Sequence, residues 1–151
     1  MSGLGLLSDR EIAELCRREP PLLSPFLDMQ LGKPSYGLGS YGYDLRLGTR
    51  FLVPLGGLNR VLDPLDFPRE HFREVKEYKT FELAPHSMVL AETMERFHMP
   101  DDVFGLCFGK STWARCGLLV NATPIEPQWS GVLVLELNNL SPLPIRLHVG
   151  R

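Results

Sequence analysis

Prolines and glycines interrupt this sequence so often that long helices have little room to form. The chain has 151 residues, of which 13 are prolines and 14 are glycines. An interruption about every ten residues favours short strands joined by turns. A chain of this length can build one hydrophobic core, so we expect a single domain over residues 1–151.

Between these interruptions, the apolar residues follow the period of a β-strand. Tyr43, Leu45 and Leu47 alternate with Asp44 and Arg46, which places the apolar side chains on one face. Other short apolar runs also predict strands, at residues 51–53, 87–91, 103–108, 118–120, 132–137 and 145–148.

One short helix is expected near the N-terminus. Ser8 and Glu11 have the spacing of a capping box, in which each side chain bonds the other's backbone. Apolar residues at helical spacing follow up to about Arg18, and the pair Pro20 and Pro21 ends the pattern. The expected fold is therefore all-β, a distorted β-barrel or jelly roll with one short N-terminal helix.

The net charge and the cysteines indicate which kinds of partner and which cellular compartment to expect. A net charge of −2 gives no global basic field, so we expect no nucleic-acid partner. Cys16, Cys107 and Cys116 form an odd set without a CxxC pair, which argues against a disulfide framework or a zinc site. The N-terminus does not resemble a signal peptide, and no apolar run reaches the roughly 18 residues of a membrane span. We therefore expect a cytoplasmic protein without a membrane partner.

Two polar segments carry further predictions. Residues 35–47 place Asp44 and Arg46 at a strand entry, as exposed charges of an edge strand or, if both are buried, as a structural pair near a subunit interface. Residues 60–79 are polar and broken by prolines, which predicts a long surface excursion.

A short motif in the second half has the letters of a phosphate-binding loop. A P-loop needs a glycine, four residues and then Gly-Lys-Ser/Thr, but Gly105 stands one residue too close to Gly109. Lys110, Ser111 and Thr112 still offer a positive charge and two hydroxyl donors beside a glycine that lets the backbone approach. The motif predicts a phosphate site on a β scaffold, with an ordinary polar turn as the alternative.

Glu136 is the candidate for chemistry. It lies inside the apolar residues 132–137, which we expect to be buried on both faces. A buried carboxylate is costly unless it is paired, so such a group has a partner or a task. Arg115 follows Ser111 by four residues, shares a face with it in a helical turn, and is a candidate partner for Glu136. A catalytic role and a structural ion pair both remain open.

Most of the chain resembles one enzyme family. The block from Gly109 to Pro144 reads GKSTWARCGLLVNATPIEPQWSGVLVLELNNLSPLP and closely resembles the core of the dCTP deaminases. The stretches SYGLGSYGYDLRL and LLSDREI are similar to the family's N-terminal half. The family belongs with the trimeric dUTPases, so the resemblance implies a dUTPase-like β domain. It also implies that the family's last strand and its C-terminal tail, which closes over the triphosphate, are missing here.

The resemblance implies an activity as well. Enzymes of this family are homotrimers with active sites shared between subunits. They convert dCTP to dUTP and ammonia in pyrimidine deoxynucleotide synthesis, with Mg²⁺ on the triphosphate and without zinc. Consistent with that, the sequence has neither the HxE nor the PCxxC pattern of the zinc-dependent nucleobase deaminases.

By motif match, Glu136 would be the general acid/base and Arg115 would hold it in its ionised form. The resemblance assigns the water to Ser111 and to the backbone at Thr123 and Pro124. It assigns the phosphates to Lys110, Ser111 and Thr112, and the sugar to Glu126.

Two other functions remain open at this stage. One is a bifunctional dCTP deaminase/dUTPase that releases dUMP, or a dUTPase. A dUTPase activates water with an aspartate, where this chain has Glu126 followed by Pro127, and plain dUTPases have an apolar residue in place of Glu136. The other is a non-catalytic nucleotide-binding trimer, which would have no need of a buried acid/base at Glu136 with Arg115 beside it.

Overall fold

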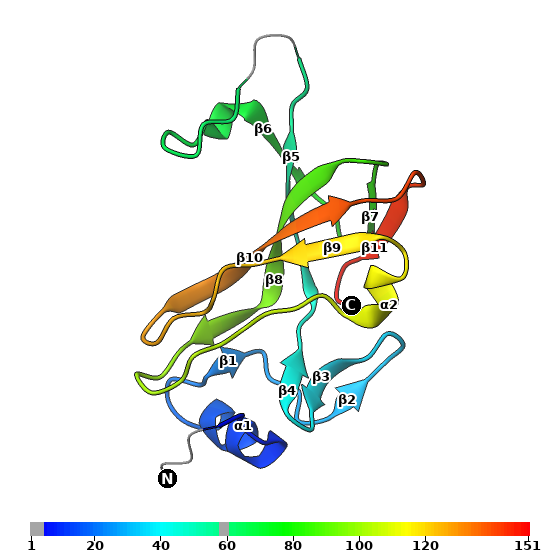
Figure 1. Ribbon diagram of the computed structural model, residues 1–151. Helices are drawn as coiled ribbons and strands as arrows, with labels where there is room; N and C mark the ends of the chain where they lie inside the picture. The colour runs from blue at the N-terminus through cyan, green and yellow to red at the C-terminus, as the bar shows by residue number, and fades with distance from the viewer. Residues whose placement is uncertain (1–4, 58–60) are drawn as a thin grey trace.

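Strands dominate the computed structural model, which describes residues 5–57 and 61–151. The strands form one six-stranded sheet and two small sheets, accompanied by two short α-helices (Figure 1). The all-β prediction is confirmed. The main sheet is open, with β6 and β9 at the ends of its order, so its strands do not close into a continuous barrel.

The main sheet is antiparallel and is built around its longest strand, β8. Its order is β6-β5-β8-β10-β9, and β1 pairs with β8 as well. The strands are β1 (Leu23–Ser24), β5 (Leu47–Pro54), β6 (Phe72–Lys76), β8 (Met88–His98), β9 (Leu118–Asn121) and β10 (Ser130–Asn139).

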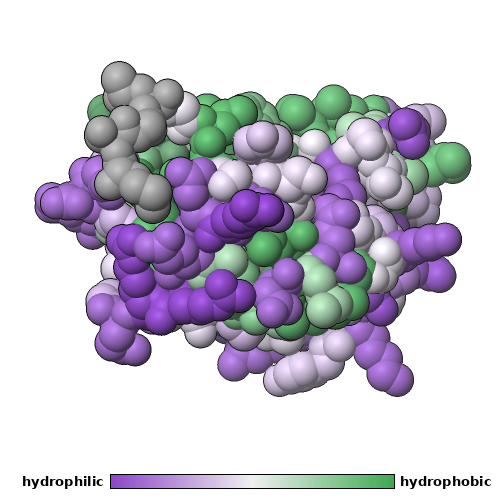
Figure 2. Space-filling model, turned by 90° about the horizontal axis from the view of Figure 1, so that it is seen from below, coloured by the Kyte–Doolittle hydropathy of each residue, from purple (hydrophilic) through white to green (hydrophobic). Residues whose placement is uncertain are grey.

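Two small sheets flank this one. The first consists of β2 (Gln30–Leu31), β3 (Tyr36–Gly39) and β4 (Gly42–Asp44), and the second pairs β7 (Thr80–Leu83) with β11 (Ile145–His148). The first lies near α1 at the lower end of Figure 1. Seen from that end, hydrophobic residues are exposed among the hydrophilic ones (Figure 2).

The helices are few and short. In α1 (Asp9–Cys16), the Ser8 backbone N–H donates to Glu11 Oε2 at 2.8 Å, and the Glu11 N–H donates to Ser8 Oγ at 3.4 Å. The capping box is thus confirmed, and the Ser8 backbone N–H and hydroxyl, which both donate to Glu11 Oε2, lower the pKa of Glu11. The others are α2 (Ser111–Ala114) and the 3₁₀ turn η1 (Arg69–His71). No helix within the described ranges is long and apolar enough to cross a membrane.

The core lies between the main sheet and the β7–β11 pair. Phe51 on β5 and Val89 on β8 are fully buried. The Phe51 ring stacks on Phe81 of β7, with ring centroids 4.5 Å apart. Large apolar rings provide much of the packing energy of such a core, and this stack joins the two sheets.

One expectation about a strand is wrong. Residues 103–108 form an apolar run, but their only ladder contact in the described chain is a bridge from Gly105 to Ile125. Phe104, Leu106 and Phe108 therefore remain 53%, 60% and 79% exposed. The excursion expected at residues 60–79 is mostly exposed over its described residues, as predicted, but it also contains β6, which pairs with β5 in the main sheet. Residue 60 itself lies outside the described residues.

Candidate active site

Glu136 stands near the middle of the main sheet. Its register partners are Leu90 on β8 and Asn121 on β9, so all three side chains share one face. Glu136 Oε2 accepts a hydrogen bond from Asn121 Nδ2 at 2.9 Å. The amide fixes one carboxylate oxygen and leaves the other, Oε1, without a protein donor among the described residues.

The expectation that β10 is buried on both faces is wrong for the single chain. Leu133, Leu135 and Leu137 are buried, whereas Val134 is 44% exposed and Glu136 is half-buried. The core covers only one face of the strand. The other, which we call the open sheet face, is largely apolar around Glu136; its members are Leu52, Leu90, Leu119, Asn121, Val134 and Glu136.

The phosphate motif lies at the start of α2, next to β9. Ser111 and Thr112 are exposed in the first turn, and α2 packs against β9. Gly117 makes the turn between them with φ +86°, and a Cβ there would lie 2.9 Å from the Ser141 Cβ. Only glycine fits this turn without strain. Because β9 also pairs with β10 at Glu136, one short strand links the motif to the carboxylate.

Lys110 is already engaged by an acidic partner. Its Nζ donates to Asp44 Oδ2 at 2.5 Å and to Ser35 Oγ at 2.9 Å. The side chains of Lys110 and Asp44 are each 30% exposed. The Asp44 carboxylate therefore balances the lysine charge at the edge of the motif.

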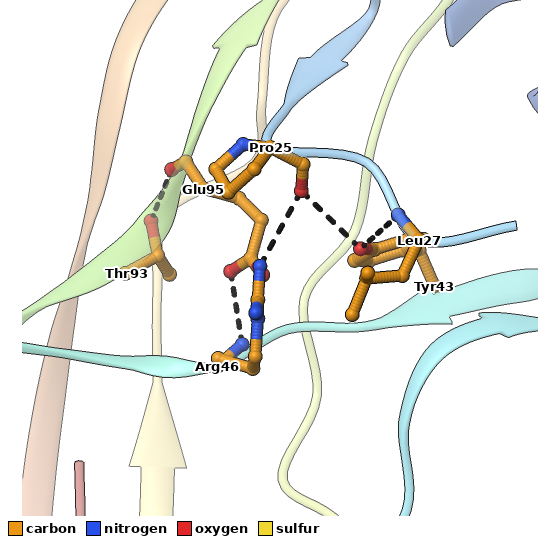
Figure 3. A network of polar contacts seen from close by, with 6 residues as sticks. All are labelled: Pro25, Leu27, Tyr43, Arg46, Thr93 and Glu95. Carbon is orange, nitrogen blue, oxygen red and sulfur yellow. Dashed lines mark hydrogen bonds and ion pairs between the residues drawn. The ribbon is translucent and has the colours of Figure 1, made fainter. Parts of the chain in front are cut away.

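Arg46 has a different partner, so Asp44 and Arg46 do not pair with each other. The fully buried Glu95 accepts from Arg46 Nε at 2.7 Å and from the Arg46 backbone N–H at 2.9 Å (Figure 3). The Thr93 hydroxyl donates to the Glu95 backbone carbonyl at 2.8 Å. A buried acid is tolerable with such partners, and this pair anchors the chain just after β4 to β8.

The remaining predicted residues lie on the surface of the single chain. Arg115 is exposed at the end of α2 and forms no ion pair within the described part of the chain, so it does not hold Glu136 here. Thr123, Pro124 and Glu126 are exposed in the loop after β9. That loop is tied down by two backbone hydrogen bonds between Gly105 and Ile125.

Two small cavities of the described chain do not have Glu136 in their lining. A shallow cavity of about 350 Å³ is lined by His86, Ser87, Met88, Asn138, Asn139 and Leu140. A second, of about 30 Å³, lies beside Arg50 and Glu92.

The described residues contain no group of three or more His, Cys, Asp and Glu side chains that could hold a metal ion. All three cysteines are free thiols. Burial raises the pKa of the Cys107 thiol, which lies two residues before Gly109, and so favours its neutral form.

Reasoning from the sequence missed Asn121, which orients the candidate carboxylate. Its side chain reaches Glu136 only because β9 and β10 pair in this register. It also missed Glu95. A signal for that residue was present, because Glu95 has the same parity along β8 as the buried Val89, Ala91 and Phe97.

Comparisons with known proteins agree with one another. A family model described as dCTP deaminase-like matches residues 6–151. A dCTP deaminase from Anaplasma marginale is 40% identical over 147 residues, covering 96% of this chain and 78% of that protein. One from Gemmatimonas aurantiaca is 42% identical over 149 residues, covering 97% and 80%.

A solved structure shows the same fold. The crystal structure of 2′-deoxycytidine 5′-triphosphate deaminase from Agrobacterium tumefaciens matches with a TM-score of 0.72. The match covers 97% of this chain but only 45% of that chain, at 21% identity. At that identity the likeness supports the fold rather than the details of the site.

Proposed function

The chain belongs to the dCTP deaminase-like family, and we propose on this premise that it converts dCTP and water to dUTP and ammonia. The observation that carries the proposal is a half-buried carboxylate, Glu136, oriented by Asn121 on an open sheet face, in a sheet whose strand β9 also contacts the helix α2 of the phosphate motif. The chain spans 78% and 80% of the length of the two dCTP deaminases described above.

The reaction needs one group that both takes up and gives back protons. Glu136 removes a proton from water as its oxygen bonds to C4 of the cytosine ring. The same carboxyl delivers this proton to N3 of the ring, then takes the remaining proton from the new C4 hydroxyl and passes it to the amine, so that the C4 carbonyl forms as the C4–N bond breaks and ammonia departs. Positioned proton transfer of this kind contributes about 10²–10⁴ in rate.

Asn121 is suited to orient Glu136 because its amide nitrogen is a hydrogen-bond donor that faces a carboxylate oxygen. Its N–H donates to Glu136 Oε2 at 2.9 Å, and this bond holds that carboxylate oxygen in place. Glu136 Oε1 receives no protein donor among the described residues and stays available for the water. Ser111 and the backbone at Thr123 and Pro124 would orient that water, while Arg115 would help to hold Glu136.

The substrate enters as the magnesium complex of dCTP. Lys110, Ser111 and Thr112 would bind the phosphates, because an ammonium and two exposed hydroxyls are suitable donors for phosphate oxygens. Glu126 would lie near the sugar. The free thiols of the three cysteines agree with a reducing compartment, and we keep the cytoplasm as the proposed location.

The proposal includes a homotrimer in which neighbouring subunits share each active site. Leu119 and Val134 are 50% and 44% exposed on the open sheet face, close to a carboxylate that one chain leaves unenclosed. An exposed apolar face of a sheet is commonly covered in the assembled protein. A second copy placed there would bury these side chains and supply the missing walls around Glu136.

Product analysis tests the function. The protein is incubated with dCTP and Mg²⁺, the nucleotides are separated by anion exchange, and ammonia is assayed in parallel. We expect dUTP and ammonia in equal amounts. Release of dUMP and pyrophosphate would replace the proposal with a bifunctional enzyme, and intact dCTP would refute it.

The same assay tests independence from zinc. After treatment with a zinc-selective chelator and restoration of Mg²⁺, the rate should be unchanged, because the described residues offer no cluster of metal ligands. A rate that falls and returns only with added zinc would contradict the proposed chemistry.

A further inference from the structure

The small N-terminal sheet reaches the phosphate motif through a single carboxylate. Asp44 Oδ2 accepts from Lys110 Nζ, from Gln30 Nε2 at 2.9 Å and from Ser35 Oγ at 3.2 Å. Ser35 in turn accepts from Lys110 Nζ at 2.9 Å. We propose that Asp44 is a positioning residue, which holds the Lys110 ammonium at the place where it meets the triphosphate of the substrate.

Asp44 stands on a stretch of backbone that is fixed on both sides. Just before it, the Tyr43 hydroxyl accepts from the Leu27 backbone N–H at 3.1 Å. Two residues after it, Arg46 is bound to the fully buried Glu95 (Figure 3). A functional side chain is most precise when its neighbours are locked in this way. The carboxylate can therefore act as a rigid reference point for a longer side chain.

Lysine gains most from such support. Its ammonium is a compact charge on a flexible stem of four carbons, and immobilising that stem costs entropy when a ligand binds. The ammonium has three donor hydrogens. Asp44 and Ser35 take two of them, so one remains for a phosphate oxygen.

The neighbouring donors are unoccupied, in keeping with a ligand site. Ser111 and Thr112 are exposed, and neither hydroxyl makes a side-chain hydrogen bond within residues 5–57 and 61–151. The motif thus places one anchored cation beside two available hydroxyls. Such a set is suited to several oxygens of one polyphosphate.

Two other roles for Asp44 give different expectations. A simple brace between β4 and the motif would act through the same contact with Lys110, but its loss would lower the stability of the fold rather than only raise the KM. A competitor for the ammonium would cancel its charge, so its removal would strengthen substrate binding. A positioning residue instead raises the KM when it is lost, and it does so only while Lys110 is present.

The experiment rests on the proposed function and measures ammonia release from dCTP with Mg²⁺. Asp44→Asn should raise the KM for dCTP about three- to tenfold. This factor corresponds to the cost of immobilising one side chain, because the substrate must then order Lys110 itself. The kcat should stay within about twofold, because Asp44 acts through a binding residue. In a Lys110→Ala background, the same substitution should leave the KM unchanged. Asp101→Asn, at an exposed aspartate, is the control and should change neither constant.

An unchanged or lower KM in Asp44→Asn would overturn the inference, as would an equal rise with and without Lys110. If Asp44→Asn does not fold, Ser35→Ala removes the other acceptor of the ammonium and should raise the KM by a smaller factor; no rise would again overturn it. A wild-type protein that releases no ammonia from dCTP would refute the proposed function itself. That result differs from an active wild type in which Asp44 has no effect.

Discussion

The buried pair of Glu95 and Arg46 gives a quantitative prediction for stability. Both Glu95 oxygens accept an N–H of Arg46, at 2.7 and 2.9 Å, and the carboxylate is fully buried. Glu95→Gln keeps the shape of the side chain, but its amide has one hydrogen-bond acceptor and one donor in place of two acceptors. One of the two Arg46 N–H groups then faces the N–H of the amide and loses its hydrogen bond. The substitution also leaves the guanidinium, which is 14% exposed, without its counter-charge.

Removing one partner of a buried ion pair costs about 3–5 kcal/mol. We expect a value near the lower end, about 3–4 kcal/mol, because Arg46 keeps a contact at 3.5 Å with the Pro25 carbonyl and lies 5.7 Å from the Tyr36 ring centre. For a domain of this size, unfolding in urea has an m-value of about 1–3 kcal/mol/M, so the midpoint should fall by about 1–4 M.

Equilibrium unfolding in urea, at one fixed protein concentration, measures this change. Glu82→Gln is the matched control, since Glu82 pairs with Arg146 at 2.7 Å but both side chains are more than half exposed, 60% and 63%. An exposed pair of this kind contributes about 0–1 kcal/mol. The reasoning fails if Glu95→Gln shifts the midpoint no more than Glu82→Gln does.

Three further predictions concern single residues. Glu136→Gln should reduce ammonia release by at least about 100-fold and keep the affinity for dCTP, because it removes the proton-transfer group and little of the binding surface; retained turnover would remove Glu136 from the mechanism. The hydrogen bond from Arg50 lowers the pKa of Glu74, so this pair stabilises the fold above pH 4.5, the usual Glu value, and its contribution is lost as the pH falls through the lower pKa of the folded state. Glu74→Gln should therefore flatten the acid side of a plot of the urea midpoint against pH. An unaltered plot would contradict this. Cys116 is exposed while burial raises the pKa of Cys107, so a disulfide reagent at pH 8 should react first at Cys116, and a fast phase that survives in Cys116→Ser would disprove the order.

Local signals in the sequence were sufficient for several elements. The Ser8 and Glu11 capping box predicted α1, because its two hydrogen bonds join residues only three positions apart. Short apolar runs predicted the strands β5, β8, β9, β10 and β11, though not their full lengths. In each case the apolar residues form the face of the strand that packs on the core, so the pattern is contained in the strand's own sequence.

Apolar character alone could not predict which strands find a partner. Residues 103–108 are as apolar as the run 132–137 in β10, yet only Gly105 pairs, with Ile125. A period of two says how side chains are arranged along an extended chain and does not say whether a second backbone lies beside it. The apolar run at Glu136 was misleading in a similar way, because the second face of β10 is open in the single chain.

The candidate site was predictable only where its residues are close in the sequence. The motif around Lys110 and Ser111 could be recognised from its letters. Asp44 lies 66 positions from Lys110, and Arg46 lies 49 positions from Glu95, so neither partner could be assigned without the fold. The roles of Arg115 and Glu126 stay predictions, because both are exposed and unpaired within the described ranges of the single chain.

The central place of β8 has a consequence for how the chain folds during its synthesis. Leu23 of β1 pairs with Phe97, and Phe51 of β5 pairs with Ala91, so both strands leave the ribosome well before the strand that they need. Until then, β5 can pair in the main sheet only with β6, in a hairpin. Most of the main sheet must therefore form late, in a step limited by the closure of long loops rather than by the growth of local structure.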